Sequence, residues 1–234
     1  MAEIIPAIIG ENYEEVIHKI EMVKNFVALV QIDALDGRFT PTEAWPYDRG
    51  GYDPAFETIL SEEEGLPFWE GLDFEIDLMV EDVERAATDW MHAGAAGLIF
   101  HIESKGDIKF IIEKIRKQFP KGDEGFPSEL KIGVAIRPST DIEALAPVID
   151  FADFIQCMGS DSIGSQGVEL DSRIYEKISA LRKKYPDITI SIDIGVNEDT
   201  APKLVAAGAN KLVAGSAIFS KDNPASTIEF FKSL

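Results

Sequence analysis

The sequence predicts a fold of the α/β class, a single (β/α)8 TIM barrel. The chain has 234 residues, which is the usual size of one such barrel and enough to bury a substantial core. Eight short apolar runs rich in β-branched residues alternate with eight amphipathic stretches, a pattern typical of parallel strands joined by crossover helices. No linker or low-complexity tract divides the sequence, so we expect one domain over residues 1–234.

Each predicted strand is a short apolar run bounded by turn signals. Gly94 and Gly208 are expected to end helices just before the fourth and the eighth strand. In chain order, the predicted strands are residues 3–9, 26–33, 72–79, 97–101, 130–137, 151–158, 188–193 and 211–214.

Three of the stretches between the predicted strands have the apolar spacing of a helix. Their apolar side chains repeat at i, i+3 or i+4, and i+7, so each stripe is expected to pack on the barrel wall. The stripes are Val16, Ile17, Ile20 and Val23; Ile108, Ile111, Ile112 and Ile115; and Ile174, Ile178 and Leu181.

The segment at about residues 42–71 departs from the regular alternation. It contains aromatic residues around Trp45-Pro46-Tyr47, and residues 53–64 within it are predicted to form a helix. We therefore expect an extended loop and helix insertion in the second βα connection. Two interpretations stay open, a lid over the functional site and a long loop without that role.

The composition excludes several classes of partner. The formal net charge is −20 and no tract is rich in Lys or Arg, which argues against nucleic acid or an anionic membrane. Simple solubility explains this acidity, with a salty habitat as the alternative. No segment approaches the roughly 18 uninterrupted apolar residues that a membrane span needs. The one cysteine, Cys157, permits no internal disulfide, so a reducing, cytoplasmic location is expected.

Polar side chains stand where predicted strands two, three and seven end, and a barrel of this type carries its functional groups at that edge. They are Gln31 and Asp33, Asp77, and Asp193. Because side chains alternate along a strand, we expect this set to point into the barrel and the intervening apolar residues to pack beneath the helices. Several carboxylates in such a place repel one another and lose hydration, so they should bind a cation or hold a proton. For any one of them, a helix cap or a pair with Lys or Arg is the alternative.

Glycines follow predicted strands seven and eight. They are Gly195 and the pair Gly215-Ser216, and the pair opens a short apolar turn at residues 217–219. Loops at these two positions, with the amino end of a short extra helix, frequently form a phosphate cradle in such barrels. Backbone N–H groups act locally, so a phosphorylated ligand is predicted in spite of the overall negative charge. Ordinary turn glycines are the alternative.

At these positions the sequence resembles the ribulose-phosphate 3-epimerase family, and the likeness extends over most of the chain. Residues 192–197 and 207–219 are similar to that family's strand-seven and strand-eight signature, and residues 32–41, 77–80 and 101–103 support it. The resemblance implies a TIM barrel of the ribulose-phosphate-binding type. It also implies an isomerase of the pentose phosphate pathway in which Asp33 and Asp193 exchange protons with opposite faces of one carbon through an enediolate.

The resemblance implies a metal site with altered ligands. The family uses two histidines and two aspartates, and this sequence has Gln31 and Asp77 where the histidines stand. The candidate ligands are therefore Gln31, Asp33, Asp77 and Asp193. Such an all-oxygen set suits Mg, Mn or Ca better than Zn or Fe. Either the metal has changed or it is absent, and no organic cofactor is expected.

Further contacts are implied by the same resemblance. His101 is expected either to support the site or to touch the substrate. Arg137 stands where the family usually has asparagine, and its guanidinium is expected to bind a second phosphate or a carboxylate, or to form a salt bridge with a nearby Asp. The loop at 158–166 is similar to the family's mobile loop but lacks its Pro-Gly-Phe core. The implied substrate contacts are Met79, His101, Arg137 and Met158, with Gly164 added to the phosphate-binding set.

The leading functional hypothesis is an epimerase or isomerase that acts on a pentose phosphate or a related ketose phosphate. Its partners would be a small phosphorylated sugar and further copies of the chain in a homo-oligomer. The first alternative is a phosphosugar lyase or decarboxylase similar to the orotidine-phosphate decarboxylase group, whose members generally carry a strand-two lysine that is missing here. The second alternative is a phosphosugar-binding barrel without catalysis.

Overall fold

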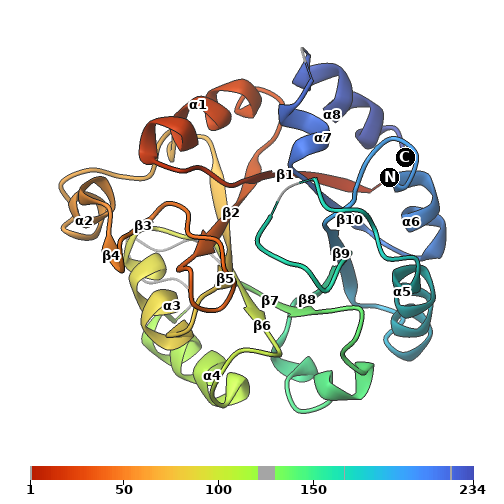
Figure 1. The fold of residues 1–234 in the computed structure, drawn as a ribbon. Coiled ribbons are helices and arrows are strands. Elements are labelled where there is room, and N and C mark those ends of the chain that lie inside the picture. Colours follow the sequence, from red (N-terminus) through yellow and green to blue (C-terminus); the bar gives the residue numbers. More distant parts are fainter. Residues whose placement is uncertain (1, 121–129, 166, 222) are drawn as a thin grey trace.

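Eight parallel strands close into a barrel in the order β1-β10-β9-β8-β7-β6-β5-β2, and helices surround it (Figure 1). The computed structural model describes residues 2–120, 130–165, 167–221 and 223–234. The predicted TIM barrel is confirmed. Its strands are β1 (Glu3–Ile8), β2 (Leu29–Leu35), β5 (Asp73–Met79), β6 (Gly97–His101), β7 (Lys131–Ile136), β8 (Phe154–Met158), β9 (Thr189–Asp193) and β10 (Lys211–Ala214).

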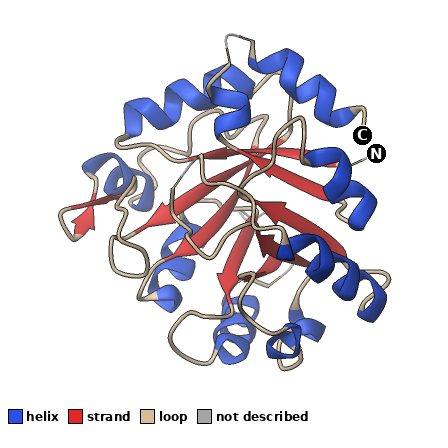
Figure 2. Ribbon diagram, turned by 45° about the vertical axis from the view of Figure 1, so that its right-hand side comes forward, coloured by secondary structure: helices blue, strands red, loops and turns tan. Residues whose placement is uncertain are grey.

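The helices form an outer layer around the strands, as Figure 2 shows. None of the helices in the described ranges is both long enough and apolar enough to cross a membrane. The helices are α1 (Tyr13–Val23), α2 (Pro54–Leu60), α3 (Val83–His92), α4 (Ile108–Gln118), α5 (Arg173–Lys184), α6 (Ala201–Ala207), α7 (Ser216–Phe219) and α8 (Pro224–Lys232), with the short 3-10 helices η1 (Ile142–Leu145) and η2 (Ile149–Phe151).

The three predicted apolar stripes lie on the buried faces of α1, α4 and α5. Every stripe residue of α4 and α5 is buried, and in α1 only Ile17 is half-buried. Asn12 begins α1 by accepting a hydrogen bond from the N–H of Glu15, and Asp107 begins α4 in the same way from the N–H of Phe110. The helical spacing of the sequence therefore predicts which side of each helix covers the strands.

Two helical predictions are wrong in their extent. The connection between β7 and β8 holds η1 and η2 instead of one helix, because Pro147 lies between them and a helix interior does not accommodate proline. The helix predicted over residues 53–64 ends at Leu60, because the chain turns at Glu62, which has a φ of +61°.

The bounds of β2 are also different from those predicted. The strand runs over Leu29–Leu35, so Asp33 lies inside it and not at its end. The cause is its long pairing with β5, which extends from Leu29 opposite Asp73 to Leu35 opposite Met79. In the same way Asp77 lies inside β5, whereas Asp193 does end β9.

The remaining strands agree with the prediction more closely. β8 begins at Phe154 and not at residue 151, because η2 occupies the residues just before it. The ends of β1, β5, β6, β7, β9 and β10 lie within one residue of those predicted.

Residues 42–71 lie outside the ring of strands, beside α1 and α3. They include α2 and the two-stranded hairpin of β3 (Tyr47–Asp48) and β4 (Gly51–Tyr52), which Figure 1 places at the periphery. The ring of Trp45 stacks on Tyr13 of α1, with centroids 5.2 Å apart, and contacts Trp90 of α3 edge-on at 5.7 Å. Phe56 of α2 lies 4.6 Å from Trp90. This aromatic cluster holds the segment against the outer helices.

The barrel interior contains both polar and apolar side chains, and the layer beneath the helices is apolar. Val30 and Ile32 of β2, for example, are buried in the main hydrophobic cluster with the helices. This is the alternation that the sequence predicts. The buried polar residues on the inward faces of the strands are Gln31, Asp33, Glu75, Asp77, His101, Gln156, Ser191, Asp193 and Lys211.

An ion pair joins opposite sides of the barrel toward its amino-terminal end. Nζ of Lys211 in β10 lies 2.5 Å from Oε2 of Glu75 in β5, and both side chains are buried. The ring of Phe154 lies 4.2 Å from the same Nζ. Two buried charges offset their loss of hydration only while both are present.

Removing one partner of this ion pair should destabilise the protein strongly. We expect Lys211→Met to lower the free energy of unfolding by about 3–5 kcal/mol, because it leaves the Glu75 carboxylate buried without its partner. The double variant Lys211→Met/Glu75→Leu should recover most of that loss. Urea denaturation of the wild type, the two single variants Lys211→Met and Glu75→Leu, and the double variant measures both effects.

Lys221→Met is the matched control, since Lys221 pairs with Glu198 at 3.2 Å with both side chains exposed. It should cost less than about 1 kcal/mol. Equal losses for the Lys211 and Lys221 variants would contradict a special role for the buried pair.

Candidate active site

A cavity opens at the carboxyl ends of the strands, and most of the predicted site residues line it. Four others do not: Gln31 and Asp77 are fully buried inside the barrel, and His101 and Arg137 lie outside the cavity wall. Residues 42–71 contribute nothing to the lining, which favours the long-loop interpretation over a lid. The predicted residues in the lining are Asp33, Met79, Met158, Gly164, Asp193, Gly195, Gly215 and Ser216.

Three aspartates from three strands lie close together, two of them in the cavity lining and Asp77 beneath it. Asp33, Asp77 and Asp193 each place one carboxylate oxygen within 4.8 Å of the others, and all three are buried. Strand pairing brings two of them together, since Asp33 of β2 stands directly opposite Asp77 of β5. Asp193 reaches them from β9, on the other side of the ring. The closed barrel therefore holds three negative side chains in one small space.

The Gln31 amide bridges two of these carboxylates. Its Nε2 donates to Oδ1 of Asp33 at 2.7 Å and, more weakly, to Oδ2 of Asp193 at 3.4 Å. Its Oε1 is buried and has no hydrogen-bond partner among the described residues. A buried carbonyl oxygen without a donor is costly, and a cation beside it would satisfy it.

Asp77 is held at both of its oxygens. His101 Nε2 lies 2.8 Å from Oδ1, and Gln156 Nε2 donates to Oδ2 at 3.1 Å. Ser191 Oγ in turn donates to Oε1 of Gln156 at 3.3 Å. His101 is fully buried, so the geometry favours polar support of Asp77 over contact with substrate.

Gln156 was not among the residues that the sequence singled out, although the signal for it was present. It is the one polar residue in the run of β8, Phe154–Met158, and it occupies the same alternating position as Phe154 and Met158. Both of these apolar neighbours belong to the interior cluster of the barrel. A polar residue at an inward position of an apolar strand requires a polar partner there.

Burial and nearby negative charge raise the pKa values of Asp33 and Asp193. Burial raises the pKa of Asp33 well above its usual range, and the charges of Asp193 and Asp77 add to the effect. Burial, followed by the charge of Asp77, raises the pKa of Asp193 to about 7. The N–H of Ile194, which donates to Asp193 Oδ1 at 2.7 Å, opposes this rise. Near neutral pH the cluster therefore holds a proton or attracts a cation.

Two glycines of the lining are required by close approach of neighbouring residues. Gly195 has a φ of +74°, and a Cβ there would lie 2.7 Å from the Cβ of Leu170. Gly164 has a φ of +83°, and a Cβ there would lie 2.7 Å from Oγ1 of Thr40. The chain thus brings three loops together at one side of the cavity. Gln166, at the end of the loop that contains Gly164, lies outside the described residues.

Arg137 does not form the salt bridge that was one of its two predicted roles. Among the described residues no carboxylate pairs with its guanidinium, which instead lies 5.3 Å from the ring centre of Phe39. Its backbone N–H donates to Oε1 of Glu103 at 3.0 Å. The sequence carried no sign of the contact with Phe39, because the two residues lie on different connections of the barrel.

Sequence comparison relates the chain to one enzyme family. Residues 61–219 match the model of the ribulose-phosphate 3 epimerase family. The cytoplasmic isoform of ribulose-phosphate 3-epimerase from Oryza sativa subsp. japonica is 27% identical, covering 97% of this chain and 91% of that protein. The Bacillus subtilis ribulose-phosphate 3-epimerase is also 27% identical, covering 95% and 94%. The match to the Candida glabrata enzyme is 29% identical and covers 68% of this chain and 60% of that protein.

Solved structures share the fold at low sequence identity. KGPDC from Streptococcus mutans in complex with a sugar phosphate superposes with a TM-score of 0.73 at 14% identity, covering 99% of this chain and 96% of that one. A 3-hexulose-6-phosphate synthase gives a TM-score of 0.64 at 17% identity, covering 100% and 99%. At these identities the likeness shows the barrel fold alone.

The raised pKa of Asp193 predicts how stability depends on pH in protein treated with EDTA. The pKa is raised on folding from the ordinary 3.8 to about 7, so the stabilising contribution is full below pH 3.8 and is lost as the pH rises to about 7. The melting temperature should therefore fall across this window in the wild type. Asp193→Asn should flatten the fall, because an amide does not ionise.

The control is Asp187→Asn, a change at an exposed aspartate, which should follow the wild type. Differential scanning calorimetry at several pH values compares the three proteins. Parallel profiles for the wild type and Asp193→Asn would show that Asp193 titrates normally.

Proposed function

Because the chain belongs to the ribulose-phosphate 3-epimerase family, we propose that it inverts one carbon of a ketose phosphate with Asp33 and Asp193 as its acid and base. One observation carries the proposal: these carboxyl groups come from opposite sides of the barrel and line one cavity, with an oxygen of each within 4.8 Å of the other. Inversion by proton transfer requires two such groups on either side of one carbon. We also propose that residues 1–234 form one barrel domain with an insertion at about 42–71.

The reaction needs one carboxylate and one carboxylic acid. The carboxylate removes the proton from the carbon next to the carbonyl, which leaves an enediolate. The other carboxyl then delivers its proton to the opposite face of the same carbon. The pKa of Asp193, about 7, suits this exchange near neutral pH, where acid and base forms are both populated. The amide of Gln31, which bonds to both groups, would hold their spacing.

The same side chains fit a divalent cation. Asp33, Asp77 and Asp193 supply three clustered carboxylates, and the unpartnered Oε1 of Gln31 supplies a fourth oxygen. This set favours Mg, Mn or Ca over Zn or Fe, because it contains no imidazole nitrogen. A cation bound there supplies electrostatic stabilisation of the enediolate oxygens. His101 and Gln156 would orient Asp77 for this role.

The phosphate of the substrate would lie against Gly164, Gly195, Gly215 and Ser216. These residues line the cavity together, and glycine allows the backbone to come close to an anion. The first N–H groups of α7 have no partner within their helix and can donate to phosphate oxygens. A fold neighbour solved in complex with a sugar phosphate supports that class of ligand. Met79 and Met158 would contact the carbon chain of the sugar.

We also infer a cytoplasmic location and a homo-oligomeric state. Cys157 is a buried free thiol, which suits a reducing compartment. Trp69 and Phe110 expose 64% and 59% of their surface and are candidates for contact with another copy of the chain.

The proposed function predicts solvent exchange that depends on both aspartates. Ribulose 5-phosphate in deuterated water should acquire deuterium at the inverted carbon, as proton NMR would show, with Mg, Mn, Ca and Zn ions supplied in turn. Asp33→Asn and Asp193→Asn should each lower kcat by about 100-fold or more, because each removes a proton-transfer group. Asp187→Asn should leave kcat unchanged.

Absence of exchange from every ketose phosphate tested, with every ion, would leave a binding barrel without this chemistry. Release of carbon dioxide or formaldehyde from a candidate substrate would instead indicate a lyase or decarboxylase. Thermal stabilisation by the sugar phosphates separates a protein that binds without turnover from one that does not bind.

Ser216→Asp tests the phosphate position separately. A carboxylate beside the substrate phosphate should raise KM for ribulose 5-phosphate by at least about 10-fold through repulsion and a lost hydrogen bond. Steady-state kinetics should show a smaller change in kcat, because Ser216 takes no part in proton transfer. Ser216→Ala is the control for loss of the hydroxyl alone. An unchanged KM in Ser216→Asp would show that the substrate phosphate does not bind beside Ser216.

A further inference from the structure

Arg137 stands on the inward face of the barrel at the level of the catalytic groups. It follows β7 directly and continues the alternation of Ala135, which packs in the interior cluster. Ile136 pairs with Cys157, so Arg137 is level with Met158, and Met158 pairs with Asp193. Neighbouring strands lie about 4.8 Å apart, so Arg137 is about two strand spacings from Asp193. An arginine side chain can span that gap toward the cavity.

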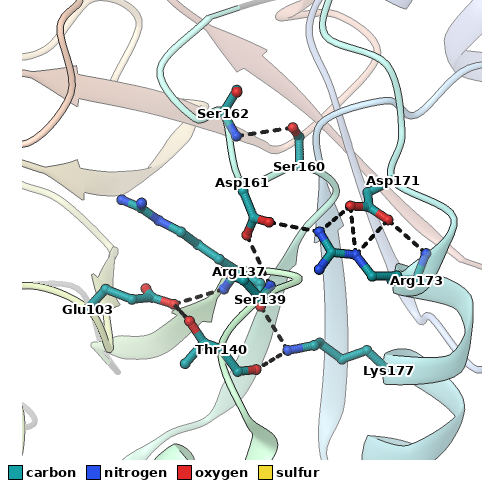
Figure 3. Close-up of polar contacts among 10 residues, drawn as sticks. All are labelled: Glu103, Arg137, Ser139, Thr140, Ser160, Asp161, Ser162, Asp171, Arg173 and Lys177. Carbon is teal, nitrogen blue, oxygen red and sulfur yellow. Dashed lines mark hydrogen bonds and ion pairs between the residues drawn. The ribbon is translucent and has the colours of Figure 1, made fainter.

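Charged neighbours in the described ranges form hydrogen bonds with the main chain of Arg137 and not with its guanidinium. Glu103 Oε1 accepts from the N–H of Arg137 at 3.0 Å and from Oγ1 of Thr140 at 2.5 Å. Lys177 Nζ donates to the carbonyl oxygen of Arg137 at 2.8 Å. Figure 3 shows these contacts around the main chain, while the side chain extends away from them and no dashed line reaches its guanidinium.

The guanidinium is charged and partly buried, and no carboxylate pairs with it in the part of the chain that the structure describes. Its Nε is buried and has no hydrogen-bond partner among these residues, although the chain holds 42 acidic residues. The nearby Asp161 is occupied by Arg173, at 2.8 Å, and by the N–H of Ser139, at 3.0 Å. A buried donor without an acceptor is unfavourable, so this arrangement suits a ligand that brings an acceptor.

Aromatic packing connects the guanidinium to the residues behind the cavity wall. Its central carbon lies 5.3 Å from the centre of the Phe39 ring, and stacking on an aromatic face restricts a flexible arginine. Phe39 packs against the interior cluster that contains Met79 and Met158, and both methionines line the cavity. Phe39 thus lies between the guanidinium and two residues of the cavity lining.

We propose that the substrate carries a second anionic group, a carboxylate or a phosphate, and that Arg137 binds it through the two-pronged edge of its guanidinium. The glycines of the phosphate site follow β9 and β10, whereas Arg137 follows β7, with Asp193 between them in the order of strands. A substrate that spans the mouth would then have an acidic group at each end and the inverted carbon between. This inference rests on the proposed function and narrows its substrate class.

Binding measurements with three ligands test the inference. Isothermal titration calorimetry would compare ribulose 5-phosphate with ribulose 1,5-bisphosphate, which adds a phosphate, and with ribonate 5-phosphate, which adds a carboxylate. The wild type should bind at least one of the doubly anionic ligands about 10-fold or more tightly than ribulose 5-phosphate. Arg137→Gln should abolish this preference and change the affinity for ribulose 5-phosphate less than about 3-fold.

Arg49→Gln is the matched control, because Arg49 is 93% exposed and its replacement removes the same charge. It should keep the preference, and Arg137→Lys should keep only part of it, since an ammonium cannot bind an anion in a two-pronged way. Equal binding of all three ligands by the wild type would overturn the inference. So would an equal loss of affinity for all three in Arg137→Gln, which would assign Arg137 to the shared phosphate.

The outcome is separable from the test of the proposed function. A preference that depends on Arg137, found in a protein without solvent exchange at any substrate carbon, would reject the epimerase and keep the second anion site. Solvent exchange on ribulose 5-phosphate without any preference for a second acidic group would keep the epimerase and reject the second anion site.

Discussion

The repulsion among three buried carboxylates is the constraint on which the site depends. Asp33, Asp77 and Asp193 are brought within 4.8 Å by strands that cannot move apart without opening the barrel. The surrounding amides and the imidazole lessen this repulsion without removing it, since the pKa of Asp193 still rises to about 7. A proton or a bound cation would neutralise part of the remaining negative charge, and enolisation uses both proton transfer and cations. The fold thus holds repelling carboxylates together, and the proposed reaction depends on the raised pKa that results.

The departure from the family pattern concerns the residues proposed to bind a cation. The resemblance implies histidines at two positions where this chain has Gln31 and Asp77. An imidazole is nevertheless present, since His101 lies behind Asp77 at 2.8 Å. In the proposed cation site, oxygen donors in place of nitrogen donors would favour harder cations. Asp33 and Asp193, the proposed acid and base, by contrast occupy the expected strands.

The sequence predicted the barrel and much of the site because both depend on local periodicity. The alternation along β2 and β5 indicates that Asp33 and Asp77 point inward, whatever the strand bounds. The bounds themselves depend on pairing between distant segments, which is why β2 extends to Leu35 beyond its predicted end. The contact of Arg137 with Phe39 is likewise set by the positions of two separate loops. No sequence pattern within either loop predicts the distance between Arg137 and Phe39.

The ion pair of Lys211 and Glu75 lies on the side of the three aspartates that is away from the cavity mouth. With the ring of Phe154 against it, and with Gly133 leaving room for that ring, the pair plugs the barrel below the three aspartates. In the proposed reaction, the acid would then exchange its proton with bulk water through the mouth. A substrate seated there would block this route, so a proton taken from carbon would stay on its carboxyl group until the ligand departs. The proton delivered to the opposite face would then come from water that entered before the substrate was bound.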